Sequence, residues 1–246
     1  MQIEIARVLA GSEIDAGDGI NGAKRCILVL SDGRKRSGVV KRGELNEVVS
    51  EIFSALLLRA WGLKVPEPFI VNEGSKISFA CADVGYPNLK QNLGLKELSD
   101  GPAKEAATRV ALMIACSLPS ATLACACDEA IDNRDRNLGN ILWDGSEEAW
   151  IDHAYALGAN PDMPDRNLLC EMSTAIGKDK VFLQSSIAQA LLLVHEHPNQ
   201  VASCMLETPI GEKQDLAIYV AKRLSALGNR LVNRFPHHSM DLLAGL

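Results

Sequence analysis

The segment at residues 132–140 constrains this chain most, because it gathers carboxylate and amide side chains between two apolar stretches. It reads Asp-Asn-Arg-Asp-Arg-Asn-Leu-Gly-Asn, so Asn140 comes five residues after Asp135. Taken alone, this spacing also fits a polar loop, since Asp and Asn are favoured in turns. The residues after position 140 therefore decide how the segment is interpreted.

A predicted hairpin over residues 140–152 supplies a third oxygen donor. Its turn is expected within residues 144–149, which would place Trp143 opposite Trp150 as a cross-strand aromatic pair. The returning strand would then bring Asp152 back beside Asn140. Two oxygen donors that are distant in sequence would thus lie at the same end of one ribbon.

These groups are the ones that phosphoryl transfer requires. Mg²⁺ prefers few protein oxygens, with phosphates and waters completing its octahedral shell. We therefore predict that Asn140 and Asp152 bind Mg²⁺, and that Asp135 accepts the proton of the hydroxyl group that is phosphorylated.

Lys41 ends a predicted strand, residues 36–41, from which its ammonium group could reach phosphate oxygens. Apolar residues at helical spacing predict that a helix comes next, over residues 44–61. Glu51 lies on the flank of this helix and is expected to pair with Lys41 and orient it. Glu47, one turn earlier on a similar face, is the alternative partner.

The loop at residues 11–22 could cover phosphates with backbone N–H groups, in particular those of Gly17, Gly19 and Gly22. It matches neither of the common glycine-rich phosphate motifs, so an ordinary hairpin or a mobile loop explains it equally well. Ser12 in this loop is a hypothetical position for autophosphorylation.

The periodicities predict an α+β fold. Residues 1–90 are expected to form an antiparallel sheet with one helix packed across it, and residues 91–246 to be mainly helical. The predicted strands are residues 2–10, 26–30, 36–41, 69–71 and 77–82. The predicted helices of the second part are residues 102–116, 121–131, 181–195 and 214–232.

Composition excludes several classes of partner. The net charge of the 246-residue chain is −6, and no basic run is longer than residues 34–36, so we expect no nucleic-acid partner. Residues 110–127 are uncharged, but Pro119 and several Ser and Thr residues favour a buried helix pair over a membrane span. Seven scattered cysteines and the lack of a signal-peptide pattern at the start favour reduced thiols and a cytoplasmic protein.

Several of these motifs resemble those of HipA-like kinases. Residues 40–41, Glu51 and the segment Gly-Leu-Lys-Val-Pro at residues 62–66 look like the first lobe of that family. Residues 135–140 and Ile151-Asp152-His153 are similar to its catalytic and metal-binding motifs. The first of these motifs also resembles the Asp-Arg-His-x-x-Asn of the related phosphoinositide kinases. The matched segments span roughly residues 36–160.

The resemblance implies a bilobal protein-kinase-like fold, with a nucleotide-binding lobe at residues 1–90 and a catalytic lobe at residues 91–246. It implies ATP with Mg²⁺, phosphorylation of Ser or Thr in a protein substrate, and an antitoxin-like protein partner as in toxin–antitoxin pairs. By matching position, Lys41 binds phosphate, Glu51 orients it, Asp135 is the base, and Asn140 and Asp152 hold the metal.

The chain departs from the family in two ways. The His of the family motif is Asn137 here, and the chain is short for a full-length HipA toxin, so it corresponds to a minimal form. Two alternatives stay open. One is a pseudokinase that binds nucleotide as a regulatory module. The other is a small-molecule kinase of the aminoglycoside or choline type, although such enzymes usually carry His where Asn133 stands.

Overall fold

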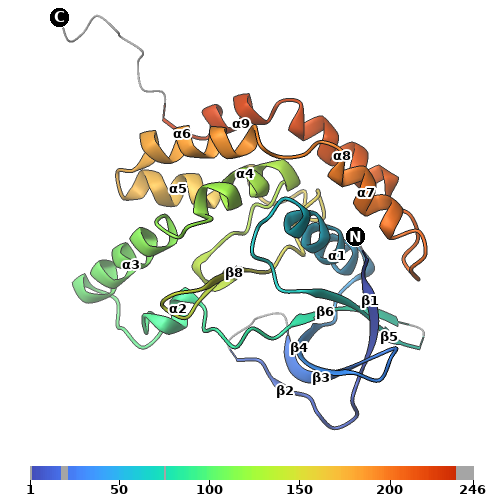
Figure 1. Ribbon diagram of the computed structural model, residues 1–246. Helices are drawn as coiled ribbons and strands as arrows, with labels where there is room; N and C mark the ends of the chain where they lie inside the picture. Colours follow the sequence, from blue (N-terminus) through green and yellow to red (C-terminus); the bar gives the residue numbers. More distant parts are fainter. Residues whose placement is uncertain (1, 18–21, 75, 237–246) are drawn as a thin grey trace, which may run out of the picture.

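We describe the structure from a computed structural model, in which residues 2–17, 22–74 and 76–236 are described. The first part of the chain is a twisted sheet with one helix, and the rest, apart from one hairpin, is chiefly helical (Figure 1). The strands of the sheet are β1 (Glu4–Val8), β2 (Ile14–Asp15), β3 (Lys24–Leu30), β4 (Lys35–Lys41), β5 (Pro68–Glu73) and β6 (Lys76–Ala82).

The sheet curls into a closed ring of five strands. Its order is β1-β5-β6-β4-β3-β2, and β1 also pairs with β3, so the only strand outside the ring among the described residues is β2. Apolar side chains fill the ring and form a small core of their own. They are Ala6, Cys26, Leu28, Leu30, Val40, Phe69, Val71 and Ala80.

One predicted feature of the sheet is wrong. β1 runs antiparallel to β3 but parallel to β5, so the sheet is mixed rather than purely antiparallel. The parallel pairing joins strands that are more than 50 residues apart, and it needs α1 (Leu45–Ala60) within the long connection. The other neighbouring strands pair antiparallel, as expected.

Gly38 is required where β4 crosses the ring interior. A Cβ atom at this position would lie 2.5 Å from Cδ1 of Leu28 and 3.0 Å from the carbonyl oxygen of Cys81. The space that a side chain would take is therefore already filled by Leu28, which is fully buried.

Helix α1 joins the sheet to the helical part of the chain. It packs against β5 and β6 on one side and against α7 (His197–Cys204) on the other (Figure 1). Its first turn is closed by a capping box in which Glu47 Oε2 accepts from the backbone N–H of Glu44 at 3.3 Å. Glu47 is thus used at the helix start, and the alternative pairing of Glu47 with Lys41 does not form.

The helical part is more divided than the periodicity predicted. The predicted helices at residues 102–116 and 121–131 are present, whereas those at residues 181–195 and 214–232 end early or break in two. In the part of the chain that the structure describes, three further helices had no clear periodic signal. The helices after α1 are α2 (Leu89–Asn92), α3 (Pro102–Ala115), α4 (Ala121–Ile131), α5 (Leu168–Ala175), α6 (Asp179–Ala190), α7 (His197–Cys204), α8 (Gln214–Leu224) and α9 (Leu227–Asn233).

The predicted hairpin is present, but with another register. It consists of β7 (Ile141–Trp143) and β8 (Glu148–Trp150), with a short 3₁₀ helix, η1 (Leu138–Asn140), before it. Trp143 pairs with Glu148, and Trp150 pairs with Ile141, so the expected tryptophan pair does not form. The cause is the turn, where the carboxylate of Asp144 accepts from two later backbone N–H groups at 2.7 and 2.8 Å and closes a four-residue loop.

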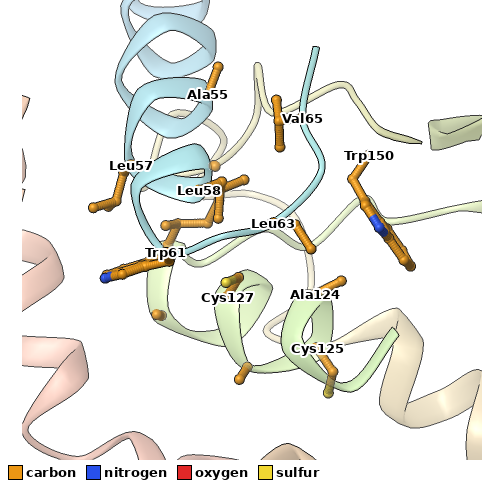
Figure 2. Close-up of a cluster of buried hydrophobic side chains, with 14 of the residues drawn as sticks. Ala55, Leu57, Leu58, Trp61, Leu63, Val65, Ala124, Cys125, Cys127 and Trp150 are labelled. Carbon is orange, nitrogen blue, oxygen red and sulfur yellow. The ribbon is translucent and has the colours of Figure 1, made fainter. Parts of the chain in front are cut away.

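A single large core connects the two parts of the chain. Figure 2 shows Leu58, Trp61 and Leu63, from the end of α1 and the segment after it, close to Ala124 and Cys127 of α4. The indole Nε1 of Trp61 donates to the carbonyl oxygen of Val194 at 3.0 Å. Over the described ranges, no helix is at once long and apolar enough to cross a bilayer.

Candidate active site

Lys41 lies between two carboxylates at the junction of the sheet and the hairpin. Its Nζ is 2.7 Å from Oε1 of Glu51 and 2.8 Å from Oδ1 of Asp152. The pair of Lys41 and Glu51 is the one expected from the sequence. The side chain of Glu51 is 3% exposed and that of Lys41 18%, so water screens this contact only weakly.

Lys41 and Glu51 hold each other in their ionised forms. Burial alone would lower the pKa of Lys41, but Glu51 and Asp152 outweigh it and raise that pKa above the usual value for lysine. Burial alone would likewise raise the pKa of Glu51, but Lys41 and His153 hold it well below its usual range. The ammonium group therefore stays charged at neutral pH.

Helix α1 also fixes the backbone that carries Asp152. The second oxygen of Glu51 accepts from the backbone N–H of His153 at 2.8 Å, and Ser50 Oγ donates to the carbonyl oxygens of His153 and Ala156 at 2.8 and 3.0 Å. Asp152 itself has φ of 68°, a left-handed conformation that costs a residue other than glycine about 1–3 kcal/mol. These contacts hold the backbone directly after Asp152, whose carboxylate contacts Lys41.

His153 should make the stability of the protein depend on pH. Burial lowers the pKa of His153, which is 1% exposed, below the ordinary value of about 6.5. The unfolded chain therefore binds a proton there that the folded chain does not, and stability falls as the pH drops below about 6.5. We expect the melting temperature to decrease between pH 7.5 and 5.5, and to decrease less in His153→Phe.

The acid sensitivity of Glu51 can be separated from that of His153 in this test. The depressed pKa of Glu51 also removes stability on acidification, but only near and below its unfolded pKa of about 4.5, outside this range. In His153→Phe the backbone N–H that Glu51 accepts from is unchanged. Equal slopes of melting temperature against pH in the wild type and the variant would contradict a buried neutral histidine.

The loop at residues 132–140 is built around the buried guanidinium of Arg136. Arg136 Nε and its NH2 nitrogen each donate to the carboxylate of Asp128 on α4 at 3.0 Å, and both side chains are fully buried. The NH1 nitrogen donates to the carbonyl oxygens of Asn140 and Ile151, at 3.1 and 2.5 Å. One side chain thus ties α4 to both arms of the hairpin.

This arrangement brings the predicted residues of the loop together. The backbone N–H of Ile151 donates to the carbonyl oxygen of Asn140 at 3.1 Å, which places Asp152 next to Asn140 as predicted. The side-chain Nδ2 of Asn140 donates to the carbonyl oxygen of Asp135 at 2.7 Å. Asn140 is therefore in contact with Asp135 and lies beside the strand end that carries Asp152, which Lys41 contacts.

Asn137 lies directly beside the carboxylate of Asp135. Its Nδ2 is 3.4 Å from Oδ1 of Asp135, and its Oδ1 accepts from the backbone N–H of Gly139 at 2.8 Å. The same Oδ1 accepts from Nζ of Lys90, on α2, at 2.9 Å. The sequence did not predict Lys90 as a residue of the site, because nothing in its local spacing relates it to residues 135–140.

Asp132 has a structural position at the end of a helix. It caps α4 with φ of 59°, and its carboxylate pairs with Arg134 and Arg223 at 3.0 Å each. Tyr219 Oη donates to the same carboxylate at 2.6 Å. Asp132 therefore anchors the start of the loop to α8.

A cavity opens beside Lys41, between the sheet and the hairpin. Lys41 and Asp152 contribute to its lining, and so does the chain segment directly after β6. The remaining lining is mostly apolar. The cavity is lined by Val39, Lys41, Glu51, Val65, Pro66, Phe79, Cys81, Ala82, Asp83, Val84, Leu142, Ile151, Asp152 and His153.

The glycine-rich loop approaches the site at one point. A Cβ atom on Gly17 would lie 3.4 Å from Nε2 of Gln91, so the loop reaches α2, next to Lys90. Gly17 and Gly22 both have positive φ, of 103° and 62°, while Gly19 lies outside the described residues. The hydroxyl of Ser12, between β1 and β2, donates to the carbonyl oxygen of Leu9 at 2.7 Å and accepts from the backbone N–H of Ile27 at 3.0 Å.

Two solved structures share this fold. One is the proinflammatory kinase CtkA of Helicobacter pylori, with a TM-score of 0.58 and 17% identity over 95% of this chain and 98% of CtkA. The other is HipA of Shewanella oneidensis MR-1, solved with HipB and operator DNA, with a TM-score of 0.52 and 13% identity. That match covers 92% of this chain and 66% of HipA.

At these identities the likeness establishes the fold alone. The chain has the HipA-like kinase fold that its motifs resembled, with a mixed α+β architecture. No protein-family model and no curated protein matches the sequence.

Proposed function

We propose that this chain is an ATP- and Mg²⁺-dependent phosphotransferase, most consistent with a HipA-like serine/threonine protein kinase. The observation that carries the proposal is the position of Lys41, charged and held between Glu51 and Asp152 beside a largely apolar cavity. A buried ammonium group with two carboxylates at a cavity wall is a preformed contact for phosphate, with a metal-binding oxygen next to it.

Each residue then has a distinct part. Lys41 binds phosphate oxygens, and Glu51 orients it from α1. Asp135 accepts the proton of the acceptor hydroxyl. Asn140 and Asp152 hold Mg²⁺, which when bound neutralises charge on the phosphates.

The donor set fits this metal. Nδ2 of Asn140 donates to the carbonyl oxygen of Asp135, and no donor to the amide oxygen is found among the described residues, so this oxygen can act as a ligand. Oδ1 of Asp152 accepts from Lys41, which leaves Oδ2 as the oxygen that can bind the metal. Two protein oxygens are what Mg²⁺ usually takes beside phosphates and waters.

The cavity offers a place for the nucleotide base. Val39, Val65 and Phe79 come from the first part of the chain, and Leu142 and Ile151 from the hairpin. Such apolar walls suit a planar aromatic ring. In this proposal, residues 1–90 and 91–246 are the two lobes, and the loop that carries Gly17 and Gly22 contributes to phosphate binding.

Partners are proposed from the fold and the charge. HipA was solved with HipB in a toxin–antitoxin system, and an antitoxin-like protein is the partner we propose here. With a net charge of −6, the chain itself is not proposed to bind nucleic acid or a membrane surface. We place it in the cytoplasm, where reduced cysteines are stable.

A pseudokinase is the second candidate, and one observation favours it. Asn137 stands where the family motif has His, and its amide oxygen is already used by Gly139 and Lys90. The small-molecule kinase alternative is weaker, because Asn133 is buried and donates to Asp128 at 2.8 Å. It is therefore part of the loop scaffold rather than a group available to substrate.

The experiment that separates these candidates is transfer of label from γ-labelled ATP. We expect label on a protein of a cell lysate, or on the chain itself, with Mg²⁺ and none with EDTA. In parallel, Mg-ATP at 100 times its Kd should stabilise the chain by roughly 2.7 kcal/mol in a thermal melt. Stabilisation without transfer would favour the pseudokinase. The absence of both stabilisation and transfer would contradict a nucleotide site.

A further inference from the structure

Lys90 brings a second lysine ammonium group to the catalytic loop. Its Nζ is 2.9 Å from Oδ1 of Asn137, whose Nδ2 is 3.4 Å from Oδ1 of Asp135. A Cβ atom on Gly139 would lie 3.4 Å from the same Nζ, so the lysine lies against the backbone of the loop. A single amide therefore separates this ammonium group from the proposed base.

The backbone around Lys90 is fixed to the hairpin. Asn88 forms an isolated antiparallel β-bridge with Leu142, and the carbonyl oxygen of Pro87 accepts from the backbone N–H of Trp143 at 2.9 Å. On the other side of Lys90, Nδ2 of Asn92 donates to the carbonyl oxygen of Trp143 at 2.9 Å. The short helix α2 is thus held at both ends, and Lys90 points from it into the site.

The ammonium group of Lys90 has no carboxylate partner among the described residues, unlike the cationic groups of Lys41 and Arg136. Lys41 contacts two carboxylates, and Arg136 is paired with Asp128. Within the described residues, Lys90 contacts a neutral amide and forms no ion pair with a carboxylate. A half-buried ammonium group without a counter-ion, beside the carboxylate of Asp135, is placed to bind an anion.

We propose that Lys90 binds the terminal phosphate of ATP and stabilises the charge on the phosphoryl group as it is transferred. The inference rests on the proposed function. In transfer, the acceptor oxygen that Asp135 contacts must lie about 3–3.5 Å from the phosphorus, so a cation beside Asp135 lies within reach of that phosphate. Asn137 is then a positioning residue that holds Lys90, and the cation comes from α2 rather than from the loop.

The test compares the affinities for Mg-ATP and Mg-ADP, since only ATP carries the terminal phosphate. In Lys90→Gln, which keeps a donor for Asn137 but removes the charge, we expect Kd for Mg-ATP to rise about tenfold. The Kd for Mg-ADP should stay within about twofold. Lys90→Arg, which keeps the charge, should fall between this variant and the wild type. The rate of label transfer should drop about 10²–10³-fold in Lys90→Gln, the usual cost of losing one such electrostatic contact.

Lys104→Gln is the matched control. Lys104 is a partly exposed lysine of α3 whose ammonium group pairs with Asp100 rather than with the catalytic loop, and both affinities should be unchanged in its variant. If Lys90→Gln changes neither affinity, or weakens ATP and ADP equally, Lys90 does not bind the terminal phosphate, although the proposed function stands. If the wild type binds neither nucleotide, the proposed function fails and this inference with it.

Discussion

Asp135→Asn is expected to lower the rate of phosphoryl transfer by about 10²–10⁴-fold, the range for loss of a general base. The substitution keeps size and shape but removes the atom that accepts the proton. The fold should tolerate it, because the carboxylate of Asp135 accepts only a long contact of 3.4 Å, from Asn137, among the described residues. The backbone of Asp135 is instead held by the side chains of Asn133 and Asn140.

The measurement is the initial rate of label transfer at saturating Mg-ATP, with Kd for Mg-ATP measured separately. Kd should change by no more than a few-fold, since Asp135 is proposed to contact the acceptor rather than the nucleotide. Asp144→Asn is the control, because Asp144 lies in the turn of the hairpin that follows this loop and Asn can form the same side-chain turn. An unchanged rate in Asp135→Asn would exclude Asp135 as the base.

The sequence was sufficient to predict contacts of the candidate site between elements that follow each other in the chain. Lys41 and Glu51 are ten residues apart, on a strand end and on the next helix, so local periodicity was enough to pair them. Asp152 and Asn140 were placed together because an antiparallel hairpin returns to its start. The hairpin register was missed because it depends on how Asp144 closes the turn, which changes the pairing without changing which residues are apolar.

Contacts between distant segments could not be predicted. The parallel pairing of β1 with β5 depends on closure of the ring, and strands in either orientation have the same period of two. Lys90 reaches Asn137 across 47 residues, through a short helix that no periodic pattern marked. Asp128 looked like one polar residue at the end of an apolar helix, and its partner Arg136 looked like one basic residue in a polar loop.

The largest loss of stability is expected from Arg136→Met, about 3–5 kcal/mol, the cost of leaving a buried charge without its partner. Arg136 and Asp128 are both fully buried, and the variant also removes the donor to the carbonyl oxygens of Asn140 and Ile151. Chemical denaturation measures this cost. Arg42→Met is the control, since Arg42 is 41% exposed with its pairs on the surface, and should cost no more than about 1 kcal/mol.

A double variant tests whether the cost comes from the unpaired charge. Asp128→Asn removes the charge but keeps an oxygen for Asn133, so Asp128→Asn with Arg136→Met leaves no isolated ion at this position in the core. If the carboxylate is what destabilises Arg136→Met, the double variant should lose less stability than the sum of the two single variants, by about 1–3 kcal/mol. Additive losses would mean that the two carbonyl oxygens, rather than Asp128, account for most of what Arg136 contributes. The loop would then be held mainly through the hairpin, and Asp135 would depend on β7 and β8 more than on α4.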